Sequence, residues 1–177
     1  MNLFKYTINN SHSLNTKLLK IIDSKIGYIK KDKGEDVYTD FDKPIMDYGK
    51  EFISEIEPTL QTFLKTNCHN QINVGKAWFQ SYTINQFHSW HTHQGCQFSA
   101  VYYIELPNKK NATEFYDVFN KKIIKPNVKE GDLLIFNSGI LHRSPISKTN
   151  KRKTVISFNF DISSFDISSS VGVTNLI

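Results

Sequence analysis

Three histidines occupy positions 88, 91 and 93 in the segment Phe87-His88-Ser89-Trp90-His91-Thr92-His93. In an extended strand, residues i and i+2 face the same side, so His91 and His93 would project together. Neutral imidazoles that converge on one point are typical ligands of a divalent transition metal. The spacing therefore predicts a metal site, with His88 off the shared face as a wall or support of the pocket.

A further histidine, His142, follows an apolar run that begins at Gly131-Asp132 and a turn at 137–139. In an all-strand domain, a third ligand arriving from a distant strand completes a three-point metal site. A lone histidine is more often a surface or hydrogen-bonded core residue, so the prediction depends on the set. We expect His91, His93 and His142 to bind one metal ion.

The elements that must position these histidines fall into two regions. The first 70 residues carry helix signals. Ser13 is a candidate cap before the apolar spacing of Leu14–Ile22, and a stripe from Asp47 to Lys65 predicts a second helix. Pro58 lies inside that stripe and should kink or break the helix. From about residue 71 the pattern changes to strands: 73–83, 97–105, 113–119, 121–125, 132–136 and 154–161.

Several short strands separated by turn residues favour an antiparallel sandwich or barrel. We therefore predict a mainly β protein with N-terminal helices, an α+β chain whose core is a double-stranded β-helix, or cupin-like jelly roll. The 177 residues suggest a single domain. Within it we expect a helical flank (1–70), a jelly-roll catalytic core (71–161) and a Ser-rich tail (162–177).

Composition limits the classes of function. The formal net charge is +5, and its lysines are scattered in short clusters, which is typical of a solvated surface and would also attract an anionic small molecule. No nucleic-acid-binding motif is present, so we do not expect nucleic acid as the main partner. Two cysteines make no disulfide framework, and neither a signal peptide nor an 18-residue apolar run is seen. We expect a cytoplasmic protein without a membrane anchor.

Three segments resemble the 2-oxoglutarate and Fe(II)-dependent oxygenase superfamily, in particular its prolyl-4-hydroxylase-like branch. They are HTHQGCQFSAVYYIELP, EGDLLIFNSGILHRSP and KRKTVISFNF. The resemblance covers roughly residues 72–161. It implies Fe(II) as the metal, 2-oxoglutarate as co-substrate and O2, with His91 as the first ligand and His142 as the last.

His93 stands where most of the superfamily has Asp, which departs from the pattern of two histidines and one carboxylate. The resemblance therefore leaves open whether His93 binds the metal or only lines the site. Glu114 and Asp117 are alternative carboxylates, although neither has the i, i+2 relation to His91.

The resemblance also implies a cation for the far carboxylate of 2-oxoglutarate, on the strand about ten residues after the last histidine. Arg152 and Lys153 both occupy this place, and only one can point inward because neighbouring strand residues face opposite sides. Tyr103 matches the position that hydrogen-bonds the same carboxylate.

The implied enzyme is a hydroxylase of an unactivated C–H bond in a protein side chain or small metabolite, releasing succinate and CO2, with a small molecule or peptide as substrate. Two alternatives use the same fold. One is a cupin-like dioxygenase or isomerase with a three-histidine metal and no 2-oxoglutarate, which gains if Arg152 and Lys153 both face solvent. The other is a non-enzymatic metal-binding barrel with a closed site.

Overall fold

The computed structural model describes residues 1–26, 37–43, 47–67 and 71–162. The Ser-rich tail lies outside the described residues except for Ile162. In chain order the strands are β1 (Leu3–Thr7), β2 (Tyr38–Thr39), β3 (Ile72–Tyr82), β4 (His88–His91), β5 (Phe98–Glu105), β6 (Glu114–Asp117), β7 (Lys122–Ile124), β8 (Asp132–Asn137), β9 (His142–Ser144) and β10 (Lys153–Ile162). The helices are α1 (Ser11–Ile26), α2 (Asp47–Thr66) and a 3-10 turn, η1 (Lys109–Asn111).

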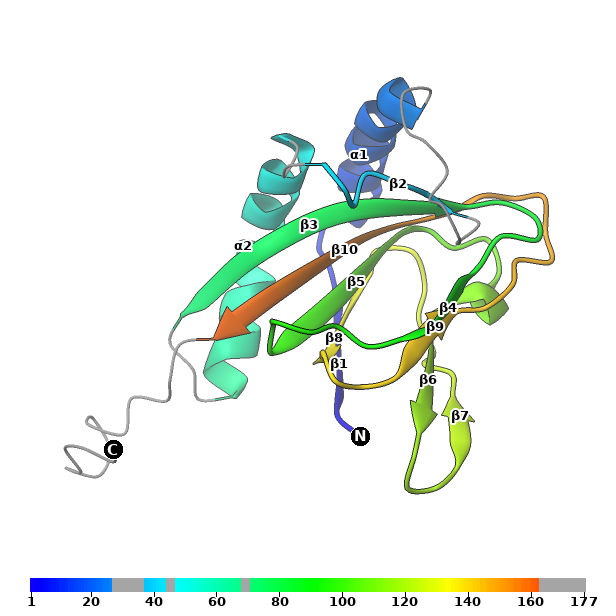
Figure 1. Cartoon of the computed structure of the whole chain (residues 1–177). Coiled ribbons are helices and arrows are strands. Elements are labelled where there is room, and N and C mark those ends of the chain that lie inside the picture. Colours follow the sequence, from blue (N-terminus) through cyan, green and yellow to red (C-terminus); the bar gives the residue numbers. More distant parts are fainter. Residues whose placement is uncertain (27–36, 44–46, 68–70, 163–177) are drawn as a thin grey trace.

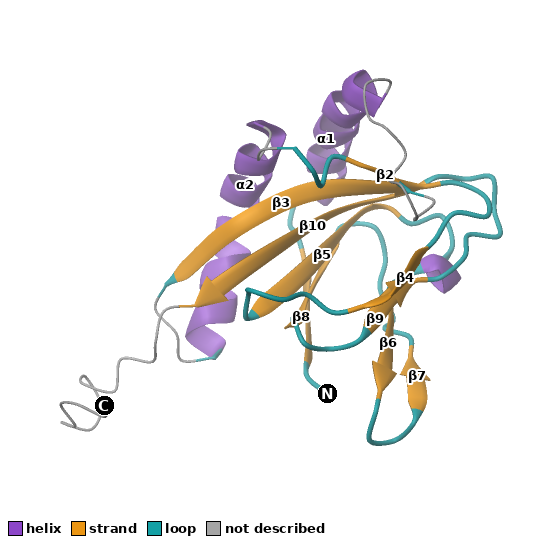
Figure 2. Cartoon of the chain, viewed as in Figure 1, coloured by secondary structure: helices purple, strands orange, loops and turns teal. Residues whose placement is uncertain are grey.

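Two antiparallel sheets form the body of the molecule (Figure 1). The larger sheet has the strand order β1-β8-β5-β10-β3-β2, and the smaller has the order β4-β9-β6-β7. Figure 2 shows α1 and α2 on one side of the larger sheet and the smaller sheet on the other. This is the predicted mainly β arrangement with N-terminal helices.

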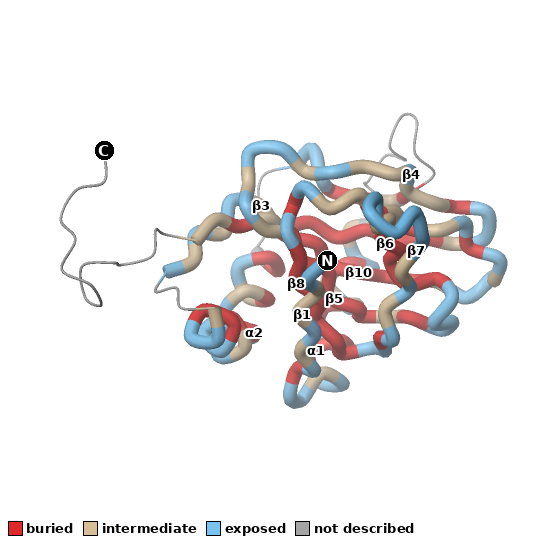
Figure 3. The backbone as a smooth tube through the Cα atoms, turned by 90° about the horizontal axis from the view of Figure 1, so that it is seen from below, coloured by how far each residue is buried: buried red, intermediate tan, exposed pale blue. Residues whose placement is uncertain are grey.

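Each long strand of the larger sheet divides its side chains between two cores. On β10, Ile156, Phe158 and Phe160 pack with Phe52 and Phe63 of α2. The alternate residues of β10 face the smaller sheet, as the two-residue period of a strand requires. Figure 3 shows buried backbone concentrated in these central strands. The helices therefore cover one face, and the other face is left to build a site between the sheets.

The helices begin and end close to the predicted positions. α1 begins at Ser11, two residues before the cap that we expected at Ser13. α2 continues through Pro58 without a break, and the Thr62 hydroxyl donates to the Pro58 carbonyl at 2.9 Å. Of the two alternatives expected at Pro58, a kink or a break, the break is therefore wrong. The apolar face of α2 packed on the sheet provides enough stabilisation to tolerate the missing backbone hydrogen bond.

The Gly131-Asp132 pair that precedes β8 has a structural role. Gly131 has a φ of 84°, which favours glycine. The Asp132 carboxylate accepts from the Lys129 N–H at 3.0 Å and from the Thr7 hydroxyl at 2.7 Å. These bonds fix the turn before β8 and join it to β1, so the pair positions the strand that leads towards His142.

Candidate functional site

The predicted histidines meet between the two sheets. His91 ends β4, His142 begins β9, and the two residues are directly paired across these strands. His93 lies two residues beyond β4, where its N–H donates to the Ser138 carbonyl at 2.9 Å. One ligand nitrogen from each imidazole lies within 4.8 Å of the others. In the described part of the chain no carboxylate or thiol joins this group.

Two of the rings are oriented by backbone carbonyls. His91 Nδ1 lies 2.7 Å from the Ser89 carbonyl, and His142 Nδ1 lies 2.8 Å from the Ile140 carbonyl. A carbonyl oxygen only accepts, so each Nδ1 carries the proton and each Nε2 keeps its lone pair. This arrangement is typical of metal-binding histidines.

Burial keeps the cluster uncharged. Desolvation lowers the pKa of His142 to about 3 and that of His93 to about 4, and it also lowers the pKa of His91. All three imidazoles are therefore neutral near pH 7. Neutral imidazole is the form that binds a metal ion, so no proton has to be removed first.

The partner of His93 differs from those of the other two. Its Nδ1 lies 3.0 Å from the side-chain amide of Asn159, whose oxygen accepts from the Ser99 hydroxyl at 2.9 Å. With the amide nitrogen towards the ring, Nδ1 accepts and Nε2 carries the proton. With the amide turned over, Nδ1 donates and Nε2 is free, and the Ser99 hydroxyl can serve either orientation. Asn159 therefore controls whether Nε2 of His93 is available.

His88 lines the pocket and supports His91. The two rings are stacked, with centroids 3.9 Å apart and planes 8° from parallel. His88 Nδ1 lies 2.9 Å from the Gln80 amide nitrogen, and the Gln80 amide oxygen accepts from the Ser157 hydroxyl at 3.2 Å. A hydrogen-bonded chain from β10 and β3 thus holds the ring that packs against a predicted metal ligand.

A buried lysine lies in the same pocket. Lys153 is 2% exposed, its ammonium donates to the Ser144 hydroxyl at 2.9 Å, and it lies 4.8 Å from the centre of the Tyr82 ring. It forms no ion pair with a described residue, and desolvation lowers its pKa to about 7. A buried cation without a counter-charge is costly, so this position fits an anionic ligand.

The neighbouring Arg152 points the other way. Its guanidinium pairs with Glu105 at 2.7 Å and with Asp23 of α1. The structure thus places Lys153 inside the pocket and Arg152 outside it. This is the expected alternation along β10.

Tyr103 is fully buried and lies outside the pocket lining. Its hydroxyl accepts from the Thr113 N–H at 3.2 Å, and Thr113 itself lines the pocket. Burial raises the pKa of Tyr103 to about 12, so the phenol stays protonated.

The two alternative carboxylates lie away from the metal ligands. Glu114 is held at 2.8 Å by Arg143 and at 2.7 Å by Lys125. Asp117 is half-buried, and its carboxylate accepts from the Asn120 side-chain amide at 2.7 Å. Both carboxylates therefore serve the smaller sheet and its β6–β7 hairpin.

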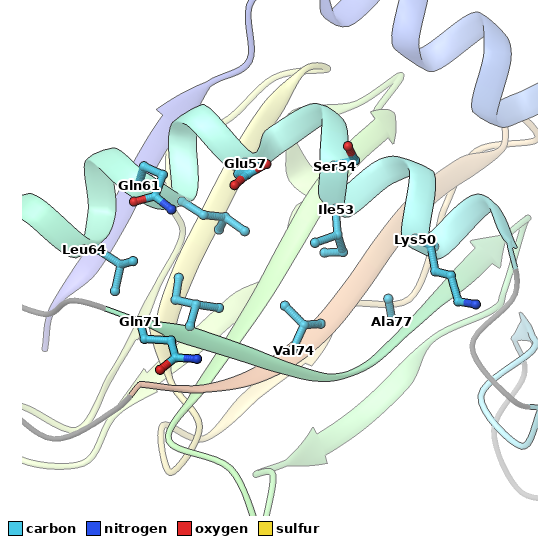
Figure 4. Close-up of a pocket in the computed structure, with 12 residues that line it drawn as sticks. Lys50, Ile53, Ser54, Glu57, Gln61, Leu64, Gln71, Val74 and Ala77 are labelled. Carbon is cyan, nitrogen blue, oxygen red and sulfur yellow. The ribbon is translucent and has the colours of Figure 1, made fainter.

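Two cavities meet at the histidines. The inner one contains Lys153 and has about 30 Å³ of free space, and the outer one has about 300 Å³. They share six lining residues: Trp78, Gln80, His88, His91, His93 and Asn159. A larger cavity of about 490 Å³ lies between α2 and β3, on the helical side of the larger sheet (Figure 4). None of the predicted site residues lines that larger cavity, so the histidine pocket is the better candidate.

Gln80 and Ser144 line the pocket and were missed in the sequence. Gln80 shares a face of β3 with Trp78 and Tyr82, which also line the pocket, and Ser144 shares a face with His142 two residues earlier. The i, i+2 rule could have found each of them once one member of its strand was known to face inward. Nothing local identifies that first member, because both faces of these strands are buried.

No family model matches this chain, and no curated protein matches it either. Solved structures do resemble it. The viral collagen prolyl hydroxylase of Paramecium Bursaria Chlorella virus-1, in complex with 2-oxoglutarate, matches with a TM-score of 0.63 and 15% identity over 90% of this chain and 96% of its own.

Two further structures match over nearly the whole chain. A prolyl hydroxylase of Trichoplax adhaerens, bound to a peptide of hypoxia inducible factor, has a TM-score of 0.66 and 14% identity over 98% of this chain and 87% of its own. The alpha-ketoglutarate-dependent epimerase SnoN of nogalamycin biosynthesis has a TM-score of 0.71 and 10% identity over 99% of this chain and 88% of its own. The chain has the fold of these enzymes, which confirms the predicted jelly roll.

Proposed function

We propose that this protein is an Fe(II)- and 2-oxoglutarate-dependent oxygenase that hydroxylates an unactivated C–H bond and releases succinate and CO2. The observation that carries the proposal is the buried Lys153, which shares one pocket with three neutral histidines. An anionic co-substrate that reacts at a metal must be held beside that metal. The pocket provides for both, because it contains a group of histidines that can bind a metal and a cation that can bind an anion. The shared fold supports the same class.

The donor set fits Fe(II). Imidazole suits iron, and the Nε2 atoms of His91 and His142 have free lone pairs because their Nδ1 atoms donate to carbonyls. We propose His93 as the third ligand, with the Asn159 amide turned to accept from its Nδ1. With 2-oxoglutarate and O2, a bound iron would supply the oxidising chemistry. The protein holds the ligands, orients both reactants and excludes water.

The charge of the inner cavity suits 2-oxoglutarate, but the cavity is too small to hold it without a rearrangement. Lys153 and Ser144 offer an ammonium and a hydroxyl to a carboxylate, and we propose that Tyr103 acts through Thr113. The free space of about 30 Å³ holds little more than one water molecule. Side chains must therefore move when the co-substrate enters, and the Tyr82 ring beside Lys153 is the first that we expect to shift.

Two observations favour a second candidate, a three-histidine metal dioxygenase without 2-oxoglutarate. The small inner cavity suits a smaller anion, and no carboxylate of the described residues accompanies the histidines. A site of three histidines would leave the iron with more positive charge than a site of two histidines and one carboxylate. The inward Lys153 is the reason to prefer 2-oxoglutarate.

Anaerobic titration distinguishes the two. Adding 2-oxoglutarate to the Fe(II)-loaded protein should produce the visible charge-transfer band of a chelated keto acid. Lys153→Met should weaken this binding by about 10- to 100-fold, because a hydrogen-bonded charge is worth roughly 1.5–3 kcal/mol. Arg152→Met is the matched control and should leave the binding unchanged. If no band forms while iron is bound, the three-histidine alternative takes precedence.

A further inference from the structure

The outer cavity differs in chemistry from the inner one. Its lining has an apolar side made by Val37, Phe41 and Trp78 and a polar side of amides, hydroxyls and imidazoles. Among the described residues no carboxylate, ammonium or guanidinium lines it. A charged group placed inside would lose water without gaining a counter-charge, which is costly. The part of a ligand that enters here is therefore uncharged.

A cation lies beside this cavity. The Lys76 ammonium is 4.0 Å from the centre of the Phe41 ring, and the Phe41 ring packs edge-on against Trp78 with centroids 5.0 Å apart. Phe41 is 41% exposed, so its ring is part of the cavity's solvent-facing rim. Lys76 forms no ion pair with any described residue, although Asp42 follows Phe41 in the chain. Its charge is available to a ligand at the rim.

From this geometry we infer that the prime substrate is a small molecule with an uncharged, partly apolar reacting portion and an anionic group that pairs with Lys76. The inference rests on the proposed function, because the outer cavity reaches the same histidines. The apolar portion lies against Trp78 and Phe41, which places it beside His93, whose ring stacks on Trp78 at 5.9 Å. A volume of about 300 Å³ is at the lower end for small-molecule sites.

Three probes of similar shape that differ in charge test which charge the rim of the outer cavity prefers. They are the anion 3-phenylpropionate, the neutral 3-phenylpropanol and the cation 3-phenylpropylamine. Binding is measured by the fluorescence of Trp78 in a Trp90→Phe background, with metal-free protein. Neither iron nor 2-oxoglutarate is needed, so failure here is separate from failure of the proposed function. We expect the carboxylate to bind more tightly than the alcohol by roughly two- to five-fold, as for a partly exposed ion pair, and the amine to bind weakest.

Variants test which residues cause the preference for the carboxylate probe. Lys76→Gln should remove the difference between carboxylate and alcohol, and Phe41→Ala should weaken all three probes alike. Lys20→Gln, an exposed lysine of α1, should change nothing. Lys153→Met must keep the preference for the carboxylate probe. If this variant lost the preference, the probe would be bound in the inner cavity beside Lys153. The inference is overturned if the amine binds as well as the carboxylate, or if Lys76→Gln keeps the preference.

Discussion

The proposed ligand His93 is a neutral imidazole and not a carboxylate, which matters for the charge of the proposed site. Three neutral imidazoles would leave a bound Fe(II) with its full double charge, which dianionic 2-oxoglutarate would neutralise. We expect His93→Ala to weaken iron binding by roughly 100-fold, since even loss of a residue that only supports a ligand costs about 10–100-fold. His93→Asp should retain iron and hold it more tightly, because an anionic carboxylate attracts Fe(II) more strongly than an imidazole that is neutral across this pH range.

Iron content after equilibrium dialysis against a competing chelator, from pH 5.5 to 8, measures both variants. His12→Ala, at an exposed position of α1, serves as the control histidine and should bind iron like the parent. Parent-like binding by His93→Ala across that range would remove His93 from the ligand set.

Asn159 decides the tautomer of His93, and its replacement tests the proposed amide orientation. Asn159→Asp can only accept from His93 Nδ1, so it should keep iron affinity or raise it by making the imidazole a better donor. Asn159→Leu removes the partner and should cost about 10–100-fold in affinity. Asn73→Asp, exposed on β3, controls for the added charge. Should Asn159→Asp release the iron while Asn159→Leu keeps it, the ring does not bind through Nε2.

At the scale of elements, one pair of short strands brings two of the histidines together. β4 and β9 place His91 opposite His142, and β10 supplies Lys153, Ser157 and Asn159 at alternate positions of one strand. Neither β4 nor β9 was predicted, because strands of four and three residues carry too few positions for a period to be read. The site therefore depends on pairings between segments about 50 residues apart.

The interior Pro58 of α2 gives a prediction about stability. Pro58 is exposed, has no N–H to donate to Ser54, and lies far from the histidine pocket. Pro58→Ala should restore that hydrogen bond and raise the free energy of unfolding by about 1–3 kcal/mol. Denaturant unfolding measures the change, and Glu55→Ala on the same exposed face should stay within about 0.5 kcal/mol of the parent. A less stable Pro58→Ala protein would show that α2 needs the proline.

At the scale of the whole molecule, the buried Lys153 should lower stability in the absence of ligand. Its pKa is about 7 in the folded protein, well below the ordinary value of 10.5. Between these two pH values the unfolded chain binds the extra proton, so stability increases with pH across this window. Below pH 7 both states are protonated and the full penalty remains. Lys153→Met should therefore stabilise the ligand-free protein near pH 7, and the gain should shrink towards pH 10.

Thermal unfolding from pH 6 to 10 measures this difference. Arg152→Met provides the contrast, because it removes ion pairs to Glu105 and Asp23 and should destabilise by a similar amount at each pH. A Lys153→Met protein that is less stable than the parent at pH 7 would contradict the buried, unpaired charge. A gain in stability together with lost co-substrate binding would show that the lysine is kept for function.

No helix in the part of the chain that the structure describes is long and apolar enough to cross a membrane. Both helices instead lay an apolar face on the larger sheet, where Tyr102 donates to Asn15 of α1 at 2.6 Å. The described elements thus form one two-sheet body with the histidine pocket between the sheets. The division into a flank, a core and a tail stays a prediction.

The sequence by itself determined what depends on local pattern. The long strands and α2 follow from side-chain periods of 2 and 3.6, which neighbouring residues set. The sequence also grouped His91 with His93, but β4 ends at His91, and the N–H of His93 is held by the Ser138 carbonyl rather than by a strand. Tertiary structure alone decided which of two adjacent cations faces inward, that Tyr103 reaches the pocket only through Thr113, and that Asn159 partners His93. These outcomes depend on strand register and on which face of the sheet the helices cover. Contacts distant in the sequence fix both, so no local signal could reveal them.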